Sequence, residues 1–428
     1  MKTYLIFLIL IIIICSCETL NAQETIGDAR CRVYYTENAL GFEKWLNRRS
    51  EVKTRRADQV YRIPVVVHVL HNGEPIGEGL NLSTERIESQ VRVLNEDFRR
   101  KEGTRGYNEH PDGEDARVEF VLARSSPTGE ATDGIVRVDM TAKEPPPFQG
   151  NPIMSGAYHS FWDPNRYLNI WAFPGFKDTA LGEARFPVST LPGLEDQQDQ
   201  DWKLPGIGEV DGLVINSLHF GTSNIDSKYN LGRTGTHEVG HFLGLFHVWG
   251  KNVNGGPSCD QDDFCQDTPP TGFRVSHCPQ DLKACDGSRA MVENYMDYAD
   301  DACMHIFTKD QVARMHAVLE NSPRRKSLLT SPGLNPPITG IPGDMGTFIK
   351  IYPNPASGRL FIRFETAPSY PEIRLTLYDG LGRVKMSQHH IVGAAMEWSI
   401  ELPYRDKGVL LLRLEAGDHV LYRRITAL

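Results

Sequence analysis

The sequence contains no apolar run long enough to form a transmembrane helix. Such a helix needs about 20 apolar residues, and the longest run here, from Tyr4 to Cys17, is shorter and lies just behind a basic residue, Lys2. A short apolar run behind a positive charge is typical of an export signal. We expect a signal peptide over residues 1–22 that is cut after Ala22, with a lipoprotein-type site at residues 14–17 as the alternative.

Excess positive charge, internal repeats and low-complexity tracts are also absent. The 428 residues include 46 Lys and Arg against 55 Asp and Glu, which gives a formal charge of −9. A protein that binds phosphate backbones needs a basic surface, so we expect no nucleic-acid partner. The length predicts two or three domains. With 40% hydrophobic and 24% charged residues, the composition is typical of a soluble globular protein, which we expect to be a monomer.

Cysteine is scarce outside one short stretch. Five of the six cysteines beyond the signal lie between Cys259 and Cys303, and the sixth is Cys31. Because an exported chain can oxidise its cysteines, such a cluster is typical of disulfides on a loop-rich region. Because the cluster has an odd number of cysteines, one of them has no disulfide partner within it.

Patterns of apolar residues divide the chain into parts. Residues 23–54 are polar and predict a removable pro-segment. Residues 55–330 predict an α+β domain with a twisted mixed sheet, because strand patterns accompany a capped helical pattern. The expected helix covers Ser83–Arg100, and the expected strands are Tyr61–Leu70, Val118–Ala123, Tyr167–Phe173 and Gly212–Phe220.

The C-terminal part has a different pattern. Residues 331–348 are rich in proline and glycine and predict a linker. Beyond it, residues 349–428 contain short alternating segments separated by turn residues, which predicts a small β-sandwich. Its expected strands include Leu360–Phe364, Ile373–Tyr378, Val409–Leu414 and Val420–Ile425.

One segment carries the residues of a catalytic zinc site. On a helix, His237 and His241 lie one turn apart and can bind one zinc ion, while Glu238 lies beside them to hold a water molecule. Gly244 can take a left-handed conformation, which turns the chain so that His247 supplies a third nitrogen. The alternative is an ordinary helix with core histidines and a solvated glutamate; the glycine and third histidine at these offsets argue against it.

Downstream, Asn294-Tyr-Met-Asp-Tyr298 has the form of a turn that places Met296 beneath such a site. A methionine alone is usually a core gap-filler, but a long zinc-binding motif followed by a Met-turn is typical of the metzincins. The finer pattern resembles the pappalysin family over roughly residues 31–325. The matching segments are Arg62–His68, His237–Gly250, Asp267–Pro269, Asn294–Tyr298 and Asp300–Met304.

This resemblance implies a secreted zinc endopeptidase that hydrolyses proteins and peptides and is made as a latent precursor. Glu238 would act as general base and then acid, and Tyr298 would donate a hydrogen bond to the oxyanion; the alternative for Tyr298 is a packed core tyrosine. Gly212–Phe220 would be the edge strand that pairs with substrate. Cys31 would bind zinc in the latent form, unless it is unpaired by chance or bonded to Cys265.

The resemblance also implies how the cysteine-rich region is built. The disulfides would be Cys259–Cys285 and Cys278–Cys303, which leaves Cys265 as a small buried residue or, alternatively, a reactive thiol. A calcium ion would bind Asp263, the carbonyl of Gln266 and Thr268. The alternative is a solvated acidic loop, because Pro270 stands where a further carboxylate would help.

Asp301 matches the base of the family's pocket for the side chain after the scissile bond, which implies cleavage before Arg or Lys. The alternative is that Asp301 only caps a turn. Self-cleavage between Thr54 and Arg55, or between Arg55 and Arg56, would then release the pro-segment. Cleavage at the basic residues 324–326 would remove the C-terminal module.

Residues 349–428 resemble the sorting domain of type IX secretion cargo, through the segments Ile351–Pro355, Gly358–Ile362 and Leu377–Val384. This implies the type IX secretion machinery as a partner, and a secreted or outer-surface location in a Gram-negative bacterium. A carbohydrate-binding or adhesive sandwich is the alternative for this domain. For the whole chain, the alternative is a surface adhesin with a relic protease domain, which predicts the loss of Glu238 or a zinc ligand; neither is lost.

Overall fold

The computed structural model describes residues 31–32, 59–144, 151–173, 180–187, 203–204, 208–250, 258–335, 349–364, 372–379, 382–391, 397–402, 407–416 and 419–428. The expected signal peptide, the pro-segment apart from residues 31–32, and residues 336–348 of the expected linker lie outside these ranges. The chain forms two compact units, one mainly of residues up to 335 and the other mainly of residues 336–428. Within the described ranges, no helix has the length and apolar character needed to cross a membrane.

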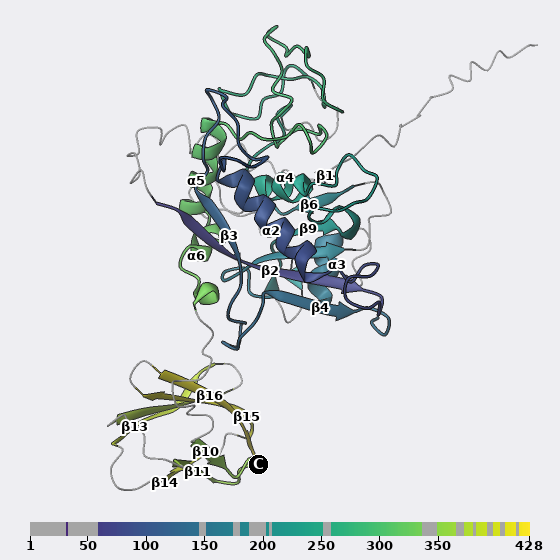
Figure 1. Cartoon of the computed structure of the whole chain (residues 1–428). Helices are drawn as coiled ribbons and strands as arrows, with labels where there is room; N and C mark the ends of the chain where they lie inside the picture. Colours follow the sequence, from purple (N-terminus) through teal and green to yellow (C-terminus); the bar gives the residue numbers. More distant parts are fainter. Residues whose placement is uncertain are drawn as a thin grey trace, which may run out of the picture. The chain divides into compact units, whose positions relative to one another are not determined.

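A mixed sheet forms the centre of the first unit (Figure 1). Its strand order is β1-β6-β9-β5-β2-β3, and β4 also pairs with β2. β2 runs parallel to β3, β4 and β5, and β5 runs parallel to β9. The β-branched residues of β2 are buried, as expected for a central parallel strand. The strands are β1 (Cys31–Arg32), β2 (Tyr61–His71), β3 (Val118–Leu122), β4 (Ile135–Asp139), β5 (Leu168–Phe173), β6 (Gly182–Ala184) and β9 (Leu213–Asn216), with a separate pair of β7 (Lys203–Leu204) and β8 (Gly208–Glu209).

The prediction that Gly212–Phe220 forms the edge strand is wrong. Within this range β9 ends at Asn216 and is followed by a 3-10 helix, Ser217–His219. β9 pairs with β5 on one side and antiparallel with β6 on the other, so both of its edges are occupied. β6 lies beyond β9, and β1, which lies within the expected pro-segment, pairs parallel with β6. Without β1, β6 would be the edge strand at this end of the sheet among the described residues.

Helices of the first unit begin at capping residues that the sequence supplies. α2 (Thr84–Phe98) begins after Ser83, whose side chain accepts a hydrogen bond from the backbone of Arg86. α2 packs on β3 and on α4 (Arg233–Phe242), and Figure 1 shows these two helices beside each other. α5 (Lys309–Asn321) begins with a capping box of Thr308 and Gln311. The remaining helices are α3 (Pro152–His159), α6 (Pro323–Leu328) and the 3-10 turn Pro332–Leu334.

α6 shows that the basic residues 324–326 are not a cleavage site in the folded protein. Arg324 and Arg325 are buried and lie in a helix, whereas an endopeptidase needs an accessible, extended chain. Both guanidinium groups form ion pairs with the buried carboxylate of Asp211, at 2.7 Å each. The predicted removal of the C-terminal module at this point is therefore wrong.

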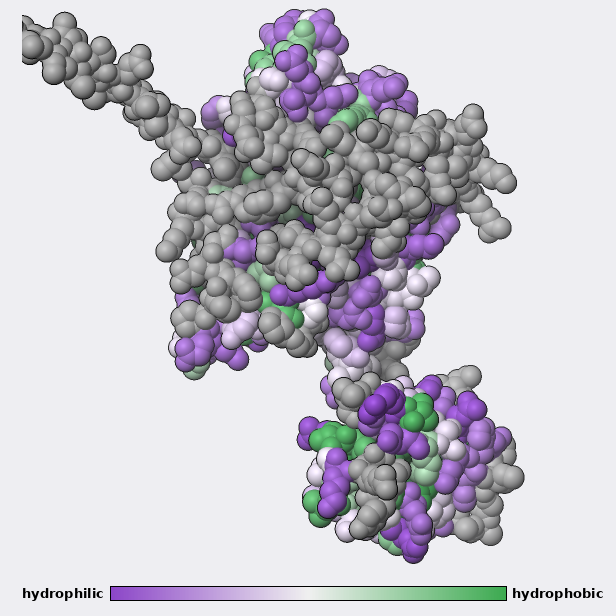
Figure 2. Space-filling model, turned by 180° about the vertical axis from the view of Figure 1, so that it is seen from behind, coloured by the Kyte–Doolittle hydropathy of each residue, from purple (hydrophilic) through white to green (hydrophobic). Residues whose placement is uncertain are grey.

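The second unit is all β and confirms the expected sandwich class. One antiparallel sheet has the order β10-β11-β14 and the other β13-β12-β15-β16, and aliphatic and aromatic side chains of both form one core. On the face that Figure 2 shows, small hydrophobic areas of this unit are separated by hydrophilic ones. The strands are β10 (Ile349–Tyr352), β11 (Arg359–Phe364), β12 (Glu372–Tyr378), β13 (Val384–Ile391), β14 (Glu397–Glu401), β15 (Gly408–Ala416) and β16 (His419–Ala427).

Candidate metal centre and active site

The candidate site is built on α4 and the turn that follows it. α4 ends at Phe242, and Gly244 has a φ of 90°, the left-handed conformation expected for it. A residue with a Cβ would be strained there. The turn brings the backbone amide of Leu245 to the carbonyl of Gly240, at 3.0 Å. As a result the chain reverses, and His247 returns towards the helix.

Three imidazole nitrogens converge at this point. The Nε2 atoms of His237, His241 and His247 lie 3.0 to 3.2 Å from one another. Three nitrogens that bind one tetrahedral zinc ion at about 2.0 to 2.1 Å lie about 3.3 Å apart. The spacing in the protein therefore fits three ligands of one ion.

The surroundings of the rings keep these nitrogens available as ligands. Nδ1 of His237 lies 2.7 Å from the carbonyl of Tyr295, and Nδ1 of His241 lies 2.8 Å from the carbonyl of Leu245. Each carbonyl accepts the Nδ1 proton, which leaves the Nε2 lone pair free of a proton. Burial also lowers the pKa of His241 to about 3, so this ring is neutral at ordinary pH. The donor set fits a zinc site.

A cysteine and a glutamate complete the surroundings of the three nitrogens. The thiol of Cys31 belongs to the same group, in which every ligand atom lies within 4.8 Å of the others. Its Sγ donates to Oε2 of Glu238 at 3.3 Å, and both side chains are buried. Cys31 and the expected general base Glu238 are thus in contact beside the candidate metal position.

Tyr298 and Met296 lie where the Met-turn motif predicts them. The hydroxyl of Tyr298 donates to the carbonyl of Cys31 at 3.1 Å, and its ring contacts those of His237 and His247. Met296 is fully buried beneath α4: a Cβ added to Gly240 would lie 2.4 Å from its sulfur. Met296 therefore forms the floor under α4, the helix that carries two of the candidate metal ligands.

Comparisons with known proteins agree with this geometry. The family model described as pregnancy-associated plasma protein-A, which stands for the pappalysin peptidases, matches residues 155–320. An extracellular metalloprotease of Arthroderma otae is 30% identical over 256 residues, which cover 59% of this chain and 76% of the relative. A mutant of promirolysin from Tannerella forsythia is 34% identical with a TM-score of 0.55, over 68% of this chain and 91% of that one.

The chain belongs to the pappalysin family. A second solved structure, mature mirolysin of Tannerella forsythia in complex with a cleaved peptide, is 36% identical with a TM-score of 0.53, over 64% of this chain and 96% of that one. A model of the secretion system C-terminal sorting domain matches residues 350–427. This protein is therefore an extracellular metalloprotease that carries the sorting domain of a secretion system.

The disulfides of this pappalysin are the pairs that the resemblance implies. Cys259 is bonded to Cys285, and Cys278 to Cys303, with Cα atoms 5.8 and 6.0 Å apart. Cys265 is a free, buried cysteine. Burial raises the pKa of its thiol well above the usual range, so the thiol stays protonated and unreactive, as expected for a small buried residue.

The residues expected to bind calcium lie in one short loop. Oδ1 of Asp263 accepts hydrogen bonds from the Thr268 hydroxyl at 2.7 Å and from the backbone of Cys265 at 3.0 Å. Oδ2 of the same carboxylate is buried and has no hydrogen-bond partner. Burial raises the pKa of Asp263 well above its ordinary value. Gln266 donates its backbone N–H to Asp310.

Asp301 lies at the start of α4. Its Oδ2 accepts hydrogen bonds from the backbone of Leu231 at 2.9 Å and of Arg233 at 3.2 Å. Because the N-cap of α4 is Gly232 and provides no side-chain cap, Asp301 caps this helix from a distant part of the chain. The expected cleavage residues Thr54 and Arg55 lie outside the described residues.

Two groups that support the site were given no role by sequence reasoning. The ring of Trp249 stacks on His247, with centroids 4.3 Å apart. Asp97 of α2 is buried. It accepts a hydrogen bond from the Thr236 hydroxyl at 2.6 Å and forms an ion pair with Arg233 at 3.1 Å. Burial raises the pKa of Asp97 to about 6. Trp249 lies inside the quoted motif and could have been noted, whereas Asp97 is remote in sequence and gives no signal.

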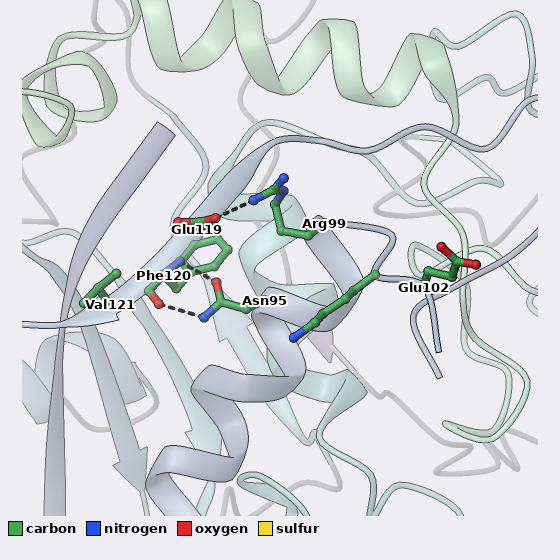
Figure 3. A pocket seen from close by; sticks show the side chains of 7 residues that line it. Asn95, Arg99, Glu102, Glu119, Phe120 and Val121 are labelled. Atoms are coloured by element: carbon green, nitrogen blue, oxygen red, sulfur yellow. Dashed lines mark hydrogen bonds and ion pairs between the residues drawn. The ribbon is translucent and has the colours of Figure 1, made fainter. Parts of the chain in front are cut away.

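A surface cavity elsewhere in the first unit is unrelated to this site. It has a volume of about 490 Å³ and lies between the end of α2 and β3. Figure 3 shows Arg99 turned towards Glu119, and Asn95 bonded to the backbone of Phe120. Arg99 also pairs with Asp115 at 3.1 Å. Arg99 is thus already paired with carboxylates, and none of the candidate site residues lines this cavity.

Proposed function

We propose that this metalloprotease is a zinc endopeptidase in which His237, His241 and His247 hold the ion and Glu238 is the catalytic base. The observation that carries the proposal is the convergence of the Nε2 atoms of His237, His241 and His247, 3.0 to 3.2 Å apart. Cys31, which belongs to the same group, contacts the Glu238 carboxylate. When bound, zinc acts as a Lewis acid that acidifies water and polarises the peptide carbonyl.

Glu238 is suited to move the proton in this reaction. Its carboxylate is buried between α4 and the edge strand β6, so bulk water does not compete with it. It accepts a proton from the attacking water and then donates it to the leaving amine, as general base and general acid in turn.

Tyr298 is suited to stabilise the oxyanion. Its hydroxyl already donates to a backbone carbonyl, that of Cys31, at 3.1 Å. A substrate carbonyl in the same place would receive the same hydrogen bond, and the bond strengthens as negative charge develops on the oxygen. Tyr298 acts here as a hydrogen-bond donor, and it does not transfer a proton.

Glu238→Ala tests the proposal. The variant should fold, bind one equivalent of zinc and lose activity by about 10³-fold or more, since the proton transfer is removed. The exposed Glu78→Ala is the control and should keep full activity. Removal of zinc by a chelator should abolish hydrolysis in both Glu78→Ala and wild type, and added zinc should restore it. Substantial proteolysis by zinc-loaded Glu238→Ala would refute the assignment.

Latency is a further part of the proposal, with Cys31 as the switch. In support, the Cys31 thiol lies with the three nitrogens and contacts Glu238, while β1 occupies the edge of β6. The segment thus covers both the ligand position and the substrate-binding strand. Cys31→Ala precursor should become active faster than wild type, and equal rates of activation would argue against the switch.

We also propose cleavage before Arg or Lys, directed by Asp301, and self-cleavage between Thr54 and Arg55. Asp301 is a buried carboxylate, and a carboxylate with little water around it pairs strongly with a guanidinium. Asp301→Asn keeps an oxygen for capping α4 but removes the charge, so it separates the two roles. Peptide profiling of Asp301→Asn should show a weaker basic preference. An unchanged profile, or a mature N-terminus far from Arg55, would contradict this part.

Calcium binding at Asp263, Gln266 and Thr268 is proposed on a separate observation. The unsatisfied Oδ2 of buried Asp263 is costly without a partner, and a calcium ion would supply one. Calcium should then raise the melting temperature of wild type but not of Asp263→Asn. An equal response of the two proteins would exclude this site.

A further inference from the structure

A glycine of the edge strand β6 lies against the side chain of Glu238. Gly182 pairs with Ile215 of β9 on one side and with Cys31 of β1 on the other. Its neighbours Leu181, Glu183 and Ala184 are all buried. Gly182 therefore lies inside the sheet, directly at the candidate active site.

No side chain fits at position 182 beside Glu238. A Cβ added to Gly182 would lie 2.6 Å from Cγ, 2.6 Å from Oε1 and 2.8 Å from Cδ of Glu238. All three atoms belong to the same side chain, so moving the carboxylate tip alone would not relieve the clash. Carbon atoms that are not bonded normally approach to about 3.5 Å.

The space, and not the backbone conformation, is what requires glycine here. Gly182 is not among the glycines with a left-handed φ, so alanine could adopt its conformation. The two backbones cannot easily separate, because β6 is paired with β9 and, in the precursor, with β1 as well. On the other side, α4 is held by His237, whose Nδ1 donates to the carbonyl of Tyr295. A methyl group at 182 would therefore displace the side chain of Glu238.

We propose that Gly182 is a positioning residue for catalysis, which seats the Glu238 carboxylate beside the metal position by leaving this space open. The inference rests on the proposed role of Glu238. A general base must lie within hydrogen-bond reach of the proton that it accepts, and a misplacement of about 1 Å can cost about 100-fold in rate. Gly182→Ala should thus reduce kcat about 100-fold, with a much smaller change in KM and with full zinc content.

A double-mutant cycle tests whether the methyl group acts through Glu238. The melting temperatures of zinc-loaded wild type, Gly182→Ala, Glu238→Ala and the double variant are compared. Gly182→Ala should melt below wild type, whereas the double variant should melt close to Glu238→Ala, because the truncated side chain no longer meets the methyl group. Gly156→Ala is the matched control: its Cβ would lie 2.7 Å from the ring of Trp171, and its destabilisation should be the same with or without Glu238.

Each outcome of the cycle decides the question. If Gly182→Ala does not fold, folding of the double variant supports the inference and failure of the double variant overturns it. Additive shifts in melting temperature, or a Gly182→Ala enzyme with normal kcat, overturn it as well. A zinc-loaded Glu238→Ala enzyme that still cleaves peptides would instead refute the proposed function, a result that the activity assay gives independently of the melting temperatures.

Discussion

The two units of the protein differ in what they bury. The interior of the C-terminal unit is apolar, and Thr376 is the one buried polar side chain among its described residues. The protease unit buries histidines, carboxylates and arginines, among them His68, Asp211 and Arg325. Buried charges cost free energy unless they are paired. The protease unit therefore depends on the pairing of its buried polar groups, whereas the sorting unit depends on apolar packing.

The largest effect that would test this contrast is expected at Asp211. Its carboxylate is buried between Arg324 and Arg325, with Oδ2 2.7 Å from a guanidinium nitrogen of each. Asp211→Asn keeps the shape but removes the charge, and should destabilise the protease unit by about 3 to 5 kcal/mol. Urea unfolding measures the loss, and hydrogen exchange locates it. Exposed Asp226→Asn is the control, and faster exchange in β12 and β15 as well would break the contrast.

A somewhat smaller effect is expected in the apolar interior of the sorting unit. Leu412→Ala should cost about 2 to 5 kcal/mol, because it leaves a cavity in a fully buried position. The neighbouring Leu411 is 40% exposed, so Leu411→Ala should have little effect. Faster exchange should be confined to residues 349–428, and hydrolysis should be unchanged. Loss of hydrolysis in Leu412→Ala would show that the two units are energetically coupled.

A third effect, of about 3 kcal/mol at most, concerns pH. The ring of His68 contacts Ser160 and Asn169 at 2.7 and 2.9 Å, and burial lowers its pKa from 6.5 to about 4. Between these two values the unfolded chain binds the proton and the folded chain does not. The free energy of unfolding should therefore fall as the pH drops from about 6.5 to about 4. His68→Gln should flatten this slope, while His277→Gln at the surface should retain it.

Much of the candidate metal site could be predicted because the residues that form it are close together in sequence. The spacing of His237, His241 and His247 follows from one helical turn and one left-handed glycine, and Gly244 has the expected conformation. Strands β2, β3 and β5 and helix α2 also lie where their apolar patterns predict them. In each case residues close in sequence determine the geometry.

What could not be predicted depends on long-range pairing. β6 spans three residues, which are too few to show an alternating pattern. The sequence therefore could not indicate that a strand lies here, at the edge of the sheet. Gly182 gains its importance only because α4 lies opposite it. The basic residues Arg324 and Arg325 looked exposed, and their burial depends on Asp211, more than a hundred residues earlier. For Asp301, the alternative of a capping residue could be named, but not the helix that it caps.

The two disulfides also affect what happens when the protein itself is cleaved by a protease. The loop from Cys259 to Cys285 overlaps the loop from Cys278 to Cys303. A single break anywhere between Cys259 and Cys303 is therefore spanned by at least one bridge, and the two fragments stay covalently joined. Met296 and Tyr298 lie inside this segment, which contains no helix or strand. An enzyme nicked there by a neighbouring copy would keep the floor of its active site attached.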